Sequence, residues 1–164
     1  MKKQEIKAQL QADEGWTELE LPKEYGMGRS FVAGDLSEDR LQVKYYIRKE
    51  DKRFFAKVFF GIHAQGPPFH AHGGSMAAVL DEAMGLSAWA WAESKALVAA
   101  KIEIEYINML PLNKVVIVEV APGKVEGRKV WMNAELKDSN GKIYSRGKGL
   151  YIKVSEDKMQ KANS

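Results

Sequence analysis

The stretch HGGSMAAVLDEAMGLSAWAWA, residues 72–92, decides the fold of this chain. From Gly73 onward it is dominated by Ala, Met, Leu and Trp, contains no proline and is apolar nearly all round, which predicts a long helix wrapped by other structure. Asp81 breaks this pattern, because it places a carboxylate near the middle of the longest apolar stretch. Burying an unpaired charge is costly, so Asp81 is expected to have a partner or a functional role.

Runs of β-branched and aromatic residues flank this helix on both sides. Before it, residues 41–49 and 53–60 predict two strands joined by a charged turn at 50–52. After it, four more strands are predicted, over residues 97–108, 115–125, 129–137 and 143–154. Apolar and charged residues alternate from Lys101 to Tyr106, the period of a sheet with one face covered. The pair Asn140-Gly141 suits a tight hairpin between the last two strands.

These elements predict an α+β architecture, in which an antiparallel sheet is wrapped around a long central helix. A chain of 164 residues is one domain of ordinary size and can bury its core without metals or disulfides. We expect that domain to span residues 41–154. Residues 1–40 are expected to form an extension packed on it, with a short helix indicated by the spacing of Ile6 and Leu10. Residues 155–164 are expected to form a polar tail.

The composition excludes several classes of function. The absence of cysteine excludes a disulfide framework, a thiolate nucleophile and a cysteine-based zinc site, and it fits a cytoplasmic location. The 25 basic and 22 acidic residues are spread along the chain, so the net charge of +3 forms no basic stripe and no nucleic-acid partner is expected. The N-terminus lacks the apolar core of a secretory signal, and acidic residues interrupt the long apolar helix, so no membrane segment is expected.

Gly73 and Gly74 stand at the predicted start of the helix, where they point to acyl-transfer chemistry. Having no side chains, they leave the first helical amides bare at the positive end of the helix dipole. Such amides could hold the negative charge that develops on a carbonyl oxygen. Asp81 follows Gly74 by seven residues, a rise of roughly 10 Å at ~1.5 Å per residue.

This rise is too long for one carbonyl to meet both groups of the same helix. A water held by Asp81 and attacking a carbonyl at Gly73 would span only about 6 Å, from two contacts of ~3 Å each. The two groups therefore serve one substrate only if they come from different chains, which predicts hydrolysis at a site across a dimer interface. The residues one turn from Asp81 leave room for a ligand or a second helix; they are Ala77, Ala78, Met84 and Gly85.

Alternatives remain open for the residues of the helix. In the structural alternative, Asp81 caps an element or forms an ion pair with a Lys or Arg from a strand. Glu82 is rotated about 100° away and is expected to point outward or to pair at an interface. The large apolar side chains are expected to pack in the core or an interface, or alternatively to line an acyl tunnel; they are Met76, Met84, Trp89 and Trp91.

The histidines and Ser75 do not complete any other catalytic pattern. His70 and His72 form an H-x-H pair, but a catalytic metal needs a third ligand and only His63 remains, so no metal site is expected. We expect His72 to orient the Gly-Gly turn by a hydrogen bond and His70 to line the loop. Ser75 has no strand before it and no histidine after it, which excludes a serine-hydrolase nucleophile.

Basic residues are in mild excess at two places, within residues 124–129 and 142–148. They could attract a phosphorylated small molecule. The alternative is that they are the solvated faces of strands.

Three motifs in this order resemble a known family. Gly66-Pro67-Pro68 precedes Ala71-His72-Gly73-Gly74, Asp81 stands nine residues after His72, and residues 124–129 read Lys-Val-Glu-Gly-Arg-Lys. The match covers most of residues 41–154 and resembles the hotdog-fold thioesterases of the His-Gly-Gly-x6-Asp type, to which phenylacetate-pathway thioesterases belong. Within that type, the chain is most similar to the branch of thioesterase superfamily members 4 and 5.

The resemblance implies an acyl-coenzyme A thioesterase with the hotdog fold, without a cofactor, as a homodimer or a dimer of dimers. It implies that the Gly73 amide binds the thioester oxygen, that His72 and Gly74 form the supporting turn, and that Asp81 of the partner subunit activates water. Arg128 and Lys129 fall where the branch contacts coenzyme A. Glu105 and Ile107 occupy positions at which the branch carries polar and basic ligand-contacting residues.

The chain departs from the family after the helix, where a Ser or Thr is common and Val98-Ala99-Ala100 carries no hydroxyl. This departure favours one rival, a non-catalytic acyl-coenzyme A sensor or carrier on the same fold. A second rival, an acyl-thioester hydratase or dehydratase, would need a histidine facing the acid. All three histidines precede the helix, so the sequence does not favour that reaction.

Overall fold

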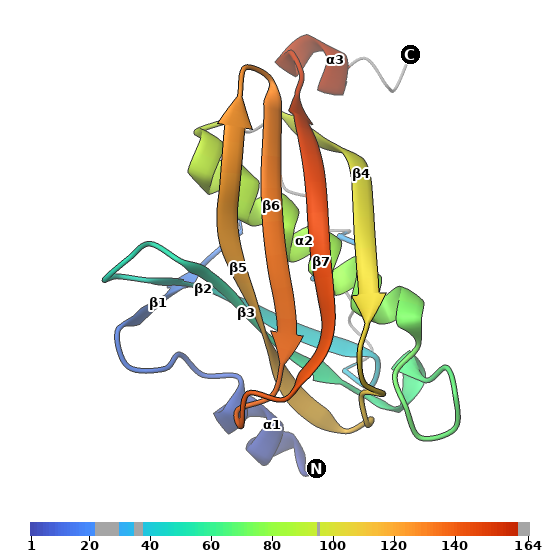
Figure 1. Cartoon of the computed structure of the whole chain (residues 1–164). Coiled ribbons are helices and arrows are strands. Elements are labelled where there is room, and N and C mark those ends of the chain that lie inside the picture. Colours follow the sequence, from blue (N-terminus) through green and yellow to red (C-terminus); the bar gives the residue numbers. More distant parts are fainter. Residues whose placement is uncertain (22–29, 35–37, 95, 161–164) are drawn as a thin grey trace.

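The computed structural model describes residues 1–21, 30–34, 38–94 and 96–160. In this part of the chain, seven antiparallel strands form one sheet in the order β1-β2-β3-β5-β6-β7-β4 (Figure 1). The strands are β1 (Trp16–Leu19), β2 (Leu41–Arg48), β3 (Phe54–Phe60), β4 (Leu97–Tyr106), β5 (Lys114–Glu126), β6 (Lys129–Lys137) and β7 (Ile143–Lys153). The helices are α1 (Lys3–Gln9), α2 (Gly73–Ala92) and α3 (Glu156–Gln160), with a short 3₁₀ helix at Ile62–Ala64.

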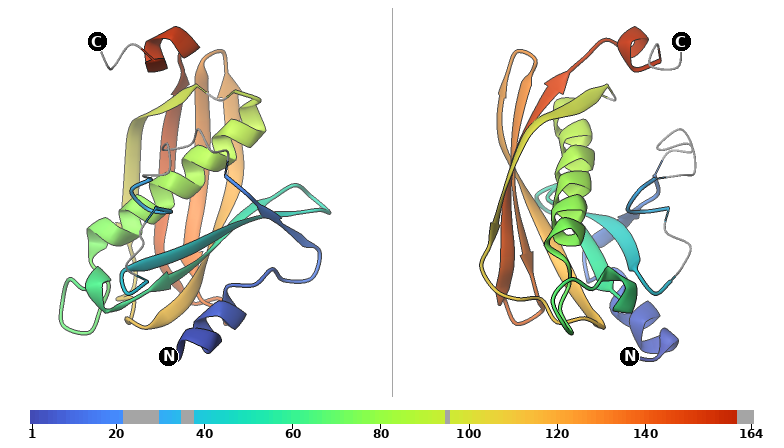
Figure 2. Two further views of the ribbon diagram at one scale, coloured as in Figure 1. Left: turned by 180° about the vertical axis from the view of Figure 1, so that it is seen from behind. Right: turned by 90° about the vertical axis from the view of Figure 1, so that its right-hand side faces the viewer.

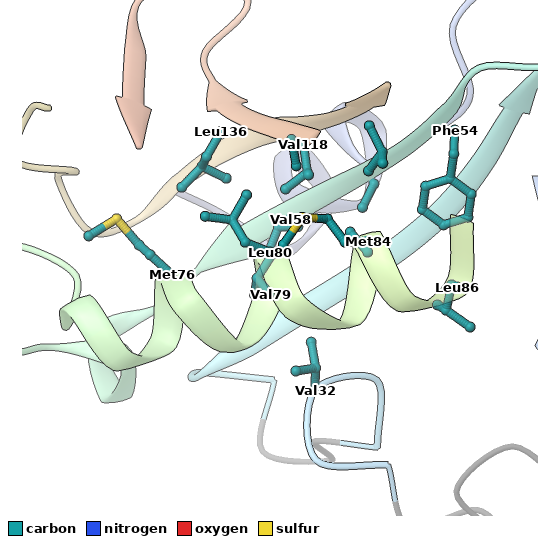
Figure 3. Close-up of a cluster of buried hydrophobic side chains, with 14 of the residues drawn as sticks. Val32, Phe54, Val58, Met76, Val79, Leu80, Met84, Leu86, Val118 and Leu136 are labelled. Carbon is teal, nitrogen blue, oxygen red and sulfur yellow. The ribbon is translucent and has the colours of Figure 1, made fainter. Parts of the chain in front are cut away.

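Helix α2 lies against the inner face of the curved sheet, as the edge-on view in Figure 2 shows. Its apolar side chains Leu80 and Met84 face the sheet residues Val118 and Leu136, while Val32 lies on the other side of the helix (Figure 3). The helix is therefore covered from more than one direction, which is why its sequence is apolar nearly all round. The expected antiparallel sheet around a long central helix is confirmed.

Strand β3 is buried on both faces, because the N-terminal extension covers its outer side. Phe59 packs with Ile6 of α1 and with Leu10, and the indole of Trp16 stacks on Phe55 with ring centroids 4.0 Å apart. The inner side chains of β3 join the core with α2. The extension thus supplies both a helix and the edge strand β1 to the sheet.

Strand β4 lies at the other end of the sheet and pairs only with β7 among the described residues. Ile102, Ile104 and Tyr106 face the helix side of the sheet, and the first and last of these are 39% and 52% exposed. A long strand with an open edge and exposed apolar side chains is a surface that proteins normally cover.

Most of the predicted elements are confirmed with small shifts at their ends. The helix in the extension, the long helix and the six predicted strands are all present, and Gly141 takes the left-handed conformation (φ 82°) in the predicted hairpin. Strand β1 and helix α3 were not predicted. In the described part of the chain, no helix has the length and apolar character needed to cross a membrane.

The β6–β7 hairpin depends on one buried carboxylate. Asp138 accepts hydrogen bonds from Lys114 Nζ at 2.7 Å, from the Tyr144 hydroxyl at 3.0 Å and from the backbone N–H groups of Asn140 and Lys142. The hydrogen bond from Lys114 is the main cause that lowers the pKa of Asp138 to about 2. The folded state therefore favours the carboxylate form of Asp138 over its protonated form.

We predict that Asp138→Asn lowers the free energy of unfolding by about 1–3 kcal/mol, because it removes the charged acceptor from a buried network. Since the folded-state pKa lies below its ordinary value, this contribution is complete above about pH 4 and is lost as the pH falls through about 2. Urea unfolding from pH 7 downward measures both effects. The matched control is Glu126→Gln, an exposed carboxylate in the β5–β6 turn that pairs with Lys124 and should change stability little. Equal losses in the two variants would contradict the assignment.

Candidate active site

His72 organises the first turn of α2. Its ring Nδ1 accepts the Gly74 N–H at 2.9 Å, and its carbonyl accepts the N–H groups of Ser75 at 3.0 Å and Met76 at 3.3 Å. The Gly73 N–H is left without an acceptor in the described part of the chain. The bare amide predicted at this turn is therefore that of Gly73, whereas the Gly74 amide is occupied.

The loop before α2 holds His72 in place. The His72 N–H donates to the Ala64 carbonyl at 2.7 Å, and a Cβ on Gly66 would lie 2.7 Å from the His72 Cα, so only glycine allows this approach. The His70 N–H donates to the Pro67 carbonyl, and its Nδ1 lies 2.8 Å from the Pro68 carbonyl oxygen. Among the described residues, no three potential metal ligands converge.

Tyr106, at the end of β4, covers the turn from the other side. Its hydroxyl donates to the Gly73 carbonyl at 2.8 Å, and a Cβ on Gly73 would lie 3.1 Å from its ring. Sequence reasoning gave Tyr106 no role at the turn. The signal was present in the alternation of β4, which places Tyr106 on the helix side of the sheet, but nothing in the sequence joins it to residue 73.

A cavity of about 260 Å³ opens beside Gly73. It is lined mainly by apolar side chains from the loop before α2, from α2 and from the end of β4: Pro67, His70, Ala71, Gly73, Met76, Tyr106, Ile107, Asn108 and Met109. The structure thus brings the predicted residue Ile107 to the same cavity as Gly73. Small-molecule sites commonly combine such an apolar lining with a few polar donors.

Asp81 lies about two turns further along α2 and is half-buried. The Tyr151 hydroxyl of β7 lies 2.8 Å from its Oδ1 and 2.9 Å from its backbone carbonyl oxygen. The expectation that this carboxylate needs a partner is confirmed, although the partner is a hydroxyl. Among the described residues it forms no ion pair.

Within one chain, Gly73 and Asp81 do not form one site. Both belong to the continuous helix α2, on which eight residues correspond to a rise of about 12 Å. Asp81 does not line the cavity beside Gly73. The separation inferred from the sequence therefore holds in the folded chain.

The expectation that Glu82 points outward or pairs at an interface is wrong, because both of its carboxylate oxygens accept hydrogen bonds within the chain. Its carboxylate accepts a hydrogen bond from the Ser30 hydroxyl at 2.8 Å and another from the Tyr45 hydroxyl of β2. The physical reason is that this face of α2 is covered by the chain's own N-terminal extension and by β2. A prediction based on helix rotation alone cannot include that cover.

The other predicted ligand-binding residues lie elsewhere. Arg128 and Lys129 are exposed at the β5–β6 turn, which Figure 1 places at the opposite end of the sheet from the end of β4. Glu105 lies on the outer face of the sheet opposite Arg146, in a hollow of about 660 Å³ lined mostly by charged residues. One chain therefore brings together His72, Gly73, Gly74 and Ile107, and leaves the remaining predicted residues apart from them.

Comparison with known proteins gives consistent matches. A family model described as "Thioesterase superfamily" matches residues 70–145. The acyl-coenzyme A thioesterase THEM4 of Rattus norvegicus is 30% identical over 124 residues, which are 74% of this chain and 53% of that protein. The acyl-coenzyme A thioesterase THEM5 of Homo sapiens is 30% identical over 96 residues, which are 57% of this chain and 38% of that protein.

The solved structure of a thioesterase superfamily protein matches this fold with a TM-score of 0.62 and 28% identity, over 68% of this chain and 53% of that one. The expected hotdog fold is confirmed. The chain spans about half the length of the rat relative and less of the human one.

The cap on α2 provides a test of the local geometry. His72→Ala removes the acceptor of the Gly74 N–H and should lower the free energy of unfolding by about 0.5–2 kcal/mol, the usual contribution of a helix N-cap. His72→Asn keeps a short side-chain acceptor and should restore most of that loss. Urea unfolding of the two variants measures the difference. If both variants lose the same stability, the cap is not what His72 contributes.

Proposed function

This chain belongs to the thioesterase superfamily, as its motifs indicated, and we propose that it is an acyl-coenzyme A thioesterase that hydrolyses a fatty or aromatic acyl-coenzyme A. The observation that carries the proposal is the Gly73 N–H at the start of α2, which has no acceptor among the described residues and lies beside an apolar cavity. A thioester oxygen at this amide would face the positive end of the helix dipole. The acyl chain would enter the cavity.

The proposed base is Asp81 of the partner subunit. It removes a proton from water while the water oxygen forms a bond to the thioester carbon, and the carbonyl oxygen becomes an oxyanion at the Gly73 N–H. When this intermediate collapses, the carbon–sulfur bond breaks and the proton held by Asp81 passes to the leaving sulfur. The products are the free acid and coenzyme A, and the reaction requires no cofactor.

The open edge of β4 supports a dimer with shared sites. If two β4 strands pair antiparallel about a twofold axis, the Tyr106 end of one chain lies beside the Leu97 end of the other. In the same chain, Leu97 pairs with Lys153, whose N–H donates to the Arg128 carbonyl at 2.8 Å. This pairing would bring Arg128 and Lys129 of the partner toward the Gly73 end, where they can bind coenzyme A phosphates.

The same pairing would bring the partner's Asp81 toward Gly73. Asp81 is tied to Tyr151, and Tyr151 is opposite Ala99 near the start of β4. Glu105, on the outer face, stays a predicted contact for a remote part of coenzyme A. A dimer of dimers and a cytoplasmic location also stay predictions.

The second candidate is a non-catalytic acyl-coenzyme A sensor or carrier. The observation that favours it is the absence of a hydroxyl side chain from Val98-Ala99-Ala100. It predicts saturable ligand binding without turnover.

We predict that Asp81→Asn lowers turnover by roughly 10²–10⁴-fold, the usual contribution of a positioned general base. Thiol release from short, medium, long and aromatic acyl-coenzyme A substrates is the measurement. Glu82→Gln is the matched control, because it changes the adjacent carboxylate, which Ser30 and Tyr45 bind in the same chain. Wild-type turnover in Asp81→Asn would remove Asp81 from the mechanism, and binding without turnover in the wild type would favour the sensor.

A mixed dimer tests whether the site is shared between chains. Asp81→Asn and Gly73→Val should each be nearly inactive, the second because its side chain would meet the Tyr106 ring and block the amide. Co-expressed in equal amounts, they should recover about a quarter of wild-type turnover, since half of randomly assorted dimers contain one intact site out of two.

The control for this mixture is Asp81→Asn co-expressed with a chain that carries both substitutions, because no dimer then contains an intact site. Activity in the first mixture that is no higher than in the control would show that both groups act within one chain.

A further inference from the structure

We propose that Tyr151 is a positioning residue for the catalytic base: its hydroxyl binds Oδ1 of Asp81 and so leaves Oδ2 as the atom that takes the proton from water. This inference rests on the proposed function and adds to it a residue that neither the sequence motifs nor the match to residues 70–145 includes. Tyr151 is only 3% exposed, so we assign it the orientation of the Asp81 carboxylate and no contact with the substrate.

The hydrogen bonds assign different roles to the two carboxylate oxygens. The Tyr151 hydroxyl lies 2.8 Å from Oδ1 of Asp81, and in the described part of the chain no hydrogen bond ends at Oδ2. A carboxylate on a helix can otherwise rotate about its side-chain bonds and present either oxygen. Fixing one oxygen leaves the other free to face the half-exposed side of α2, where the substrate of the partner subunit would bind.

The same hydroxyl can serve both protonation states of Asp81. It carries one proton and lies within reach of two acceptors, Oδ1 at 2.8 Å and the Asp81 carbonyl oxygen at 2.9 Å. While Asp81 is ionised, the hydroxyl donates to Oδ1. Once Asp81 has taken a proton on Oδ2, Oδ1 is still an acceptor, so the hydroxyl can keep donating to it. The buried polar atoms keep hydrogen-bond partners throughout the catalytic cycle without movement of the backbone.

The ring of Tyr151 fills space that two glycines leave for it. A Cβ on Gly149 would lie 2.5 Å from Cε2 of Tyr151, and a Cβ on Gly85 would lie 3.4 Å from Cε1. Gly149 belongs to β7 and Gly85 to α2, so the ring occupies space that both the sheet and the helix leave for it. This packing fixes the position of the hydroxyl, which is what a positioning role requires.

Strand β4 has a small residue and an irregularity beside Tyr151. Ala99 of β4 is its partner in the sheet register, and β4 has an irregularity between Ala99 and Lys101. Irregularities of this kind occur often next to active sites, because they change where side chains point. The first residues of β4 carry no hydroxyl, and Tyr151 supplies one to Asp81 from the neighbouring strand.

A second tyrosine in the chain provides a matched control. The hydroxyl of Tyr45 donates to Glu82, the residue next to Asp81, so both tyrosines hold carboxylates of α2. Tyr45→Phe and Tyr151→Phe therefore remove the same type of bond from adjacent residues. Only the second change touches the proposed base.

The experiment is a double-mutant cycle in turnover with Asp81→Asn, Tyr151→Phe and the variant that carries both. We expect Tyr151→Phe to lower kcat by about 10- to 100-fold, the factor that corresponds to a hydrogen bond with a charged group, and to leave KM within about twofold. Thermal unfolding should stay close to that of Tyr45→Phe, whose kcat should match the wild type. In the Asp81→Asn background, Tyr151→Phe should cause no further loss, because the two groups act as a unit.

Gly149→Ala is a second variant that keeps the hydroxyl but displaces the ring. It should also lower kcat, and Asp81→Asn should again mask its effect.

Unchanged kcat in Tyr151→Phe, with Asp81→Asn impaired, would overturn this inference alone. A loss that multiplies with that of Asp81→Asn would overturn it as well, since Tyr151 would then act independently of the base. Wild-type kcat in Asp81→Asn would remove Asp81 from the mechanism and this inference with it, whereas binding without turnover in the wild type would remove the proposed function.

Discussion

The close approach of α2 to strand β7 is the constraint on which the rest of the structure depends. It is possible because the inner face of β7 carries glycine where the helix is nearest. A Cβ on Gly147 would lie 3.1 Å from the Met84 Cε and 3.6 Å from the Leu80 Cβ, so even the smallest side chain there would fill the remaining space and force the end of Met84 to shift. Two residues further along, Gly149 leaves space for the ring of Tyr151. The same glycines therefore set the depth of the core and the distance over which a hydroxyl of β7 reaches Asp81.

Two adjacent carboxylates then fix how the helix is turned within the sheet. The Asp81 carboxylate accepts a hydrogen bond from a hydroxyl of β7, and the Glu82 carboxylate accepts hydrogen bonds from a hydroxyl of β2 and from Ser30. The partners of the two acids lie on different sides of α2. Rotating the helix by one residue would separate both acids from their partners and leave half-buried charges without hydrogen bonds, a costly state. Apolar packing alone would not define this angle, because α2 is apolar around most of its circumference. The polar contacts thus provide the orientation that the apolar residues leave undefined.

The sequence predicts elements whose signal is local and misses contacts whose partners are distant. The period of two in β4 and the proline-free apolar run of α2 are properties of neighbouring residues, and both elements are confirmed. Strand β1 has only four residues, too few for a clear alternation, and it forms by pairing with β2. Sequence reasoning identified Asp81 as a buried acid but not Tyr151, which lies 70 residues further along the chain. The cover over Glu82 was missed for the same reason, because its partners come from distant segments.

The start of α2 and the open edge of β4 are incomplete in complementary ways. In the described part of the chain, the first has an amide without an acceptor beside an apolar cavity that no carboxylate lines, while the second exposes Ile102 and Tyr106 along an edge without a strand partner. A second copy of the chain would remedy both, since pairing the edges covers the apolar side chains and carries an acid toward the amide. The separation of Gly73 and Asp81 along one helix is too long for a side-chain movement to close. If the amide and the acid act on one thioester, the contact between chains is therefore a requirement of the chemistry as well as of the exposed strand.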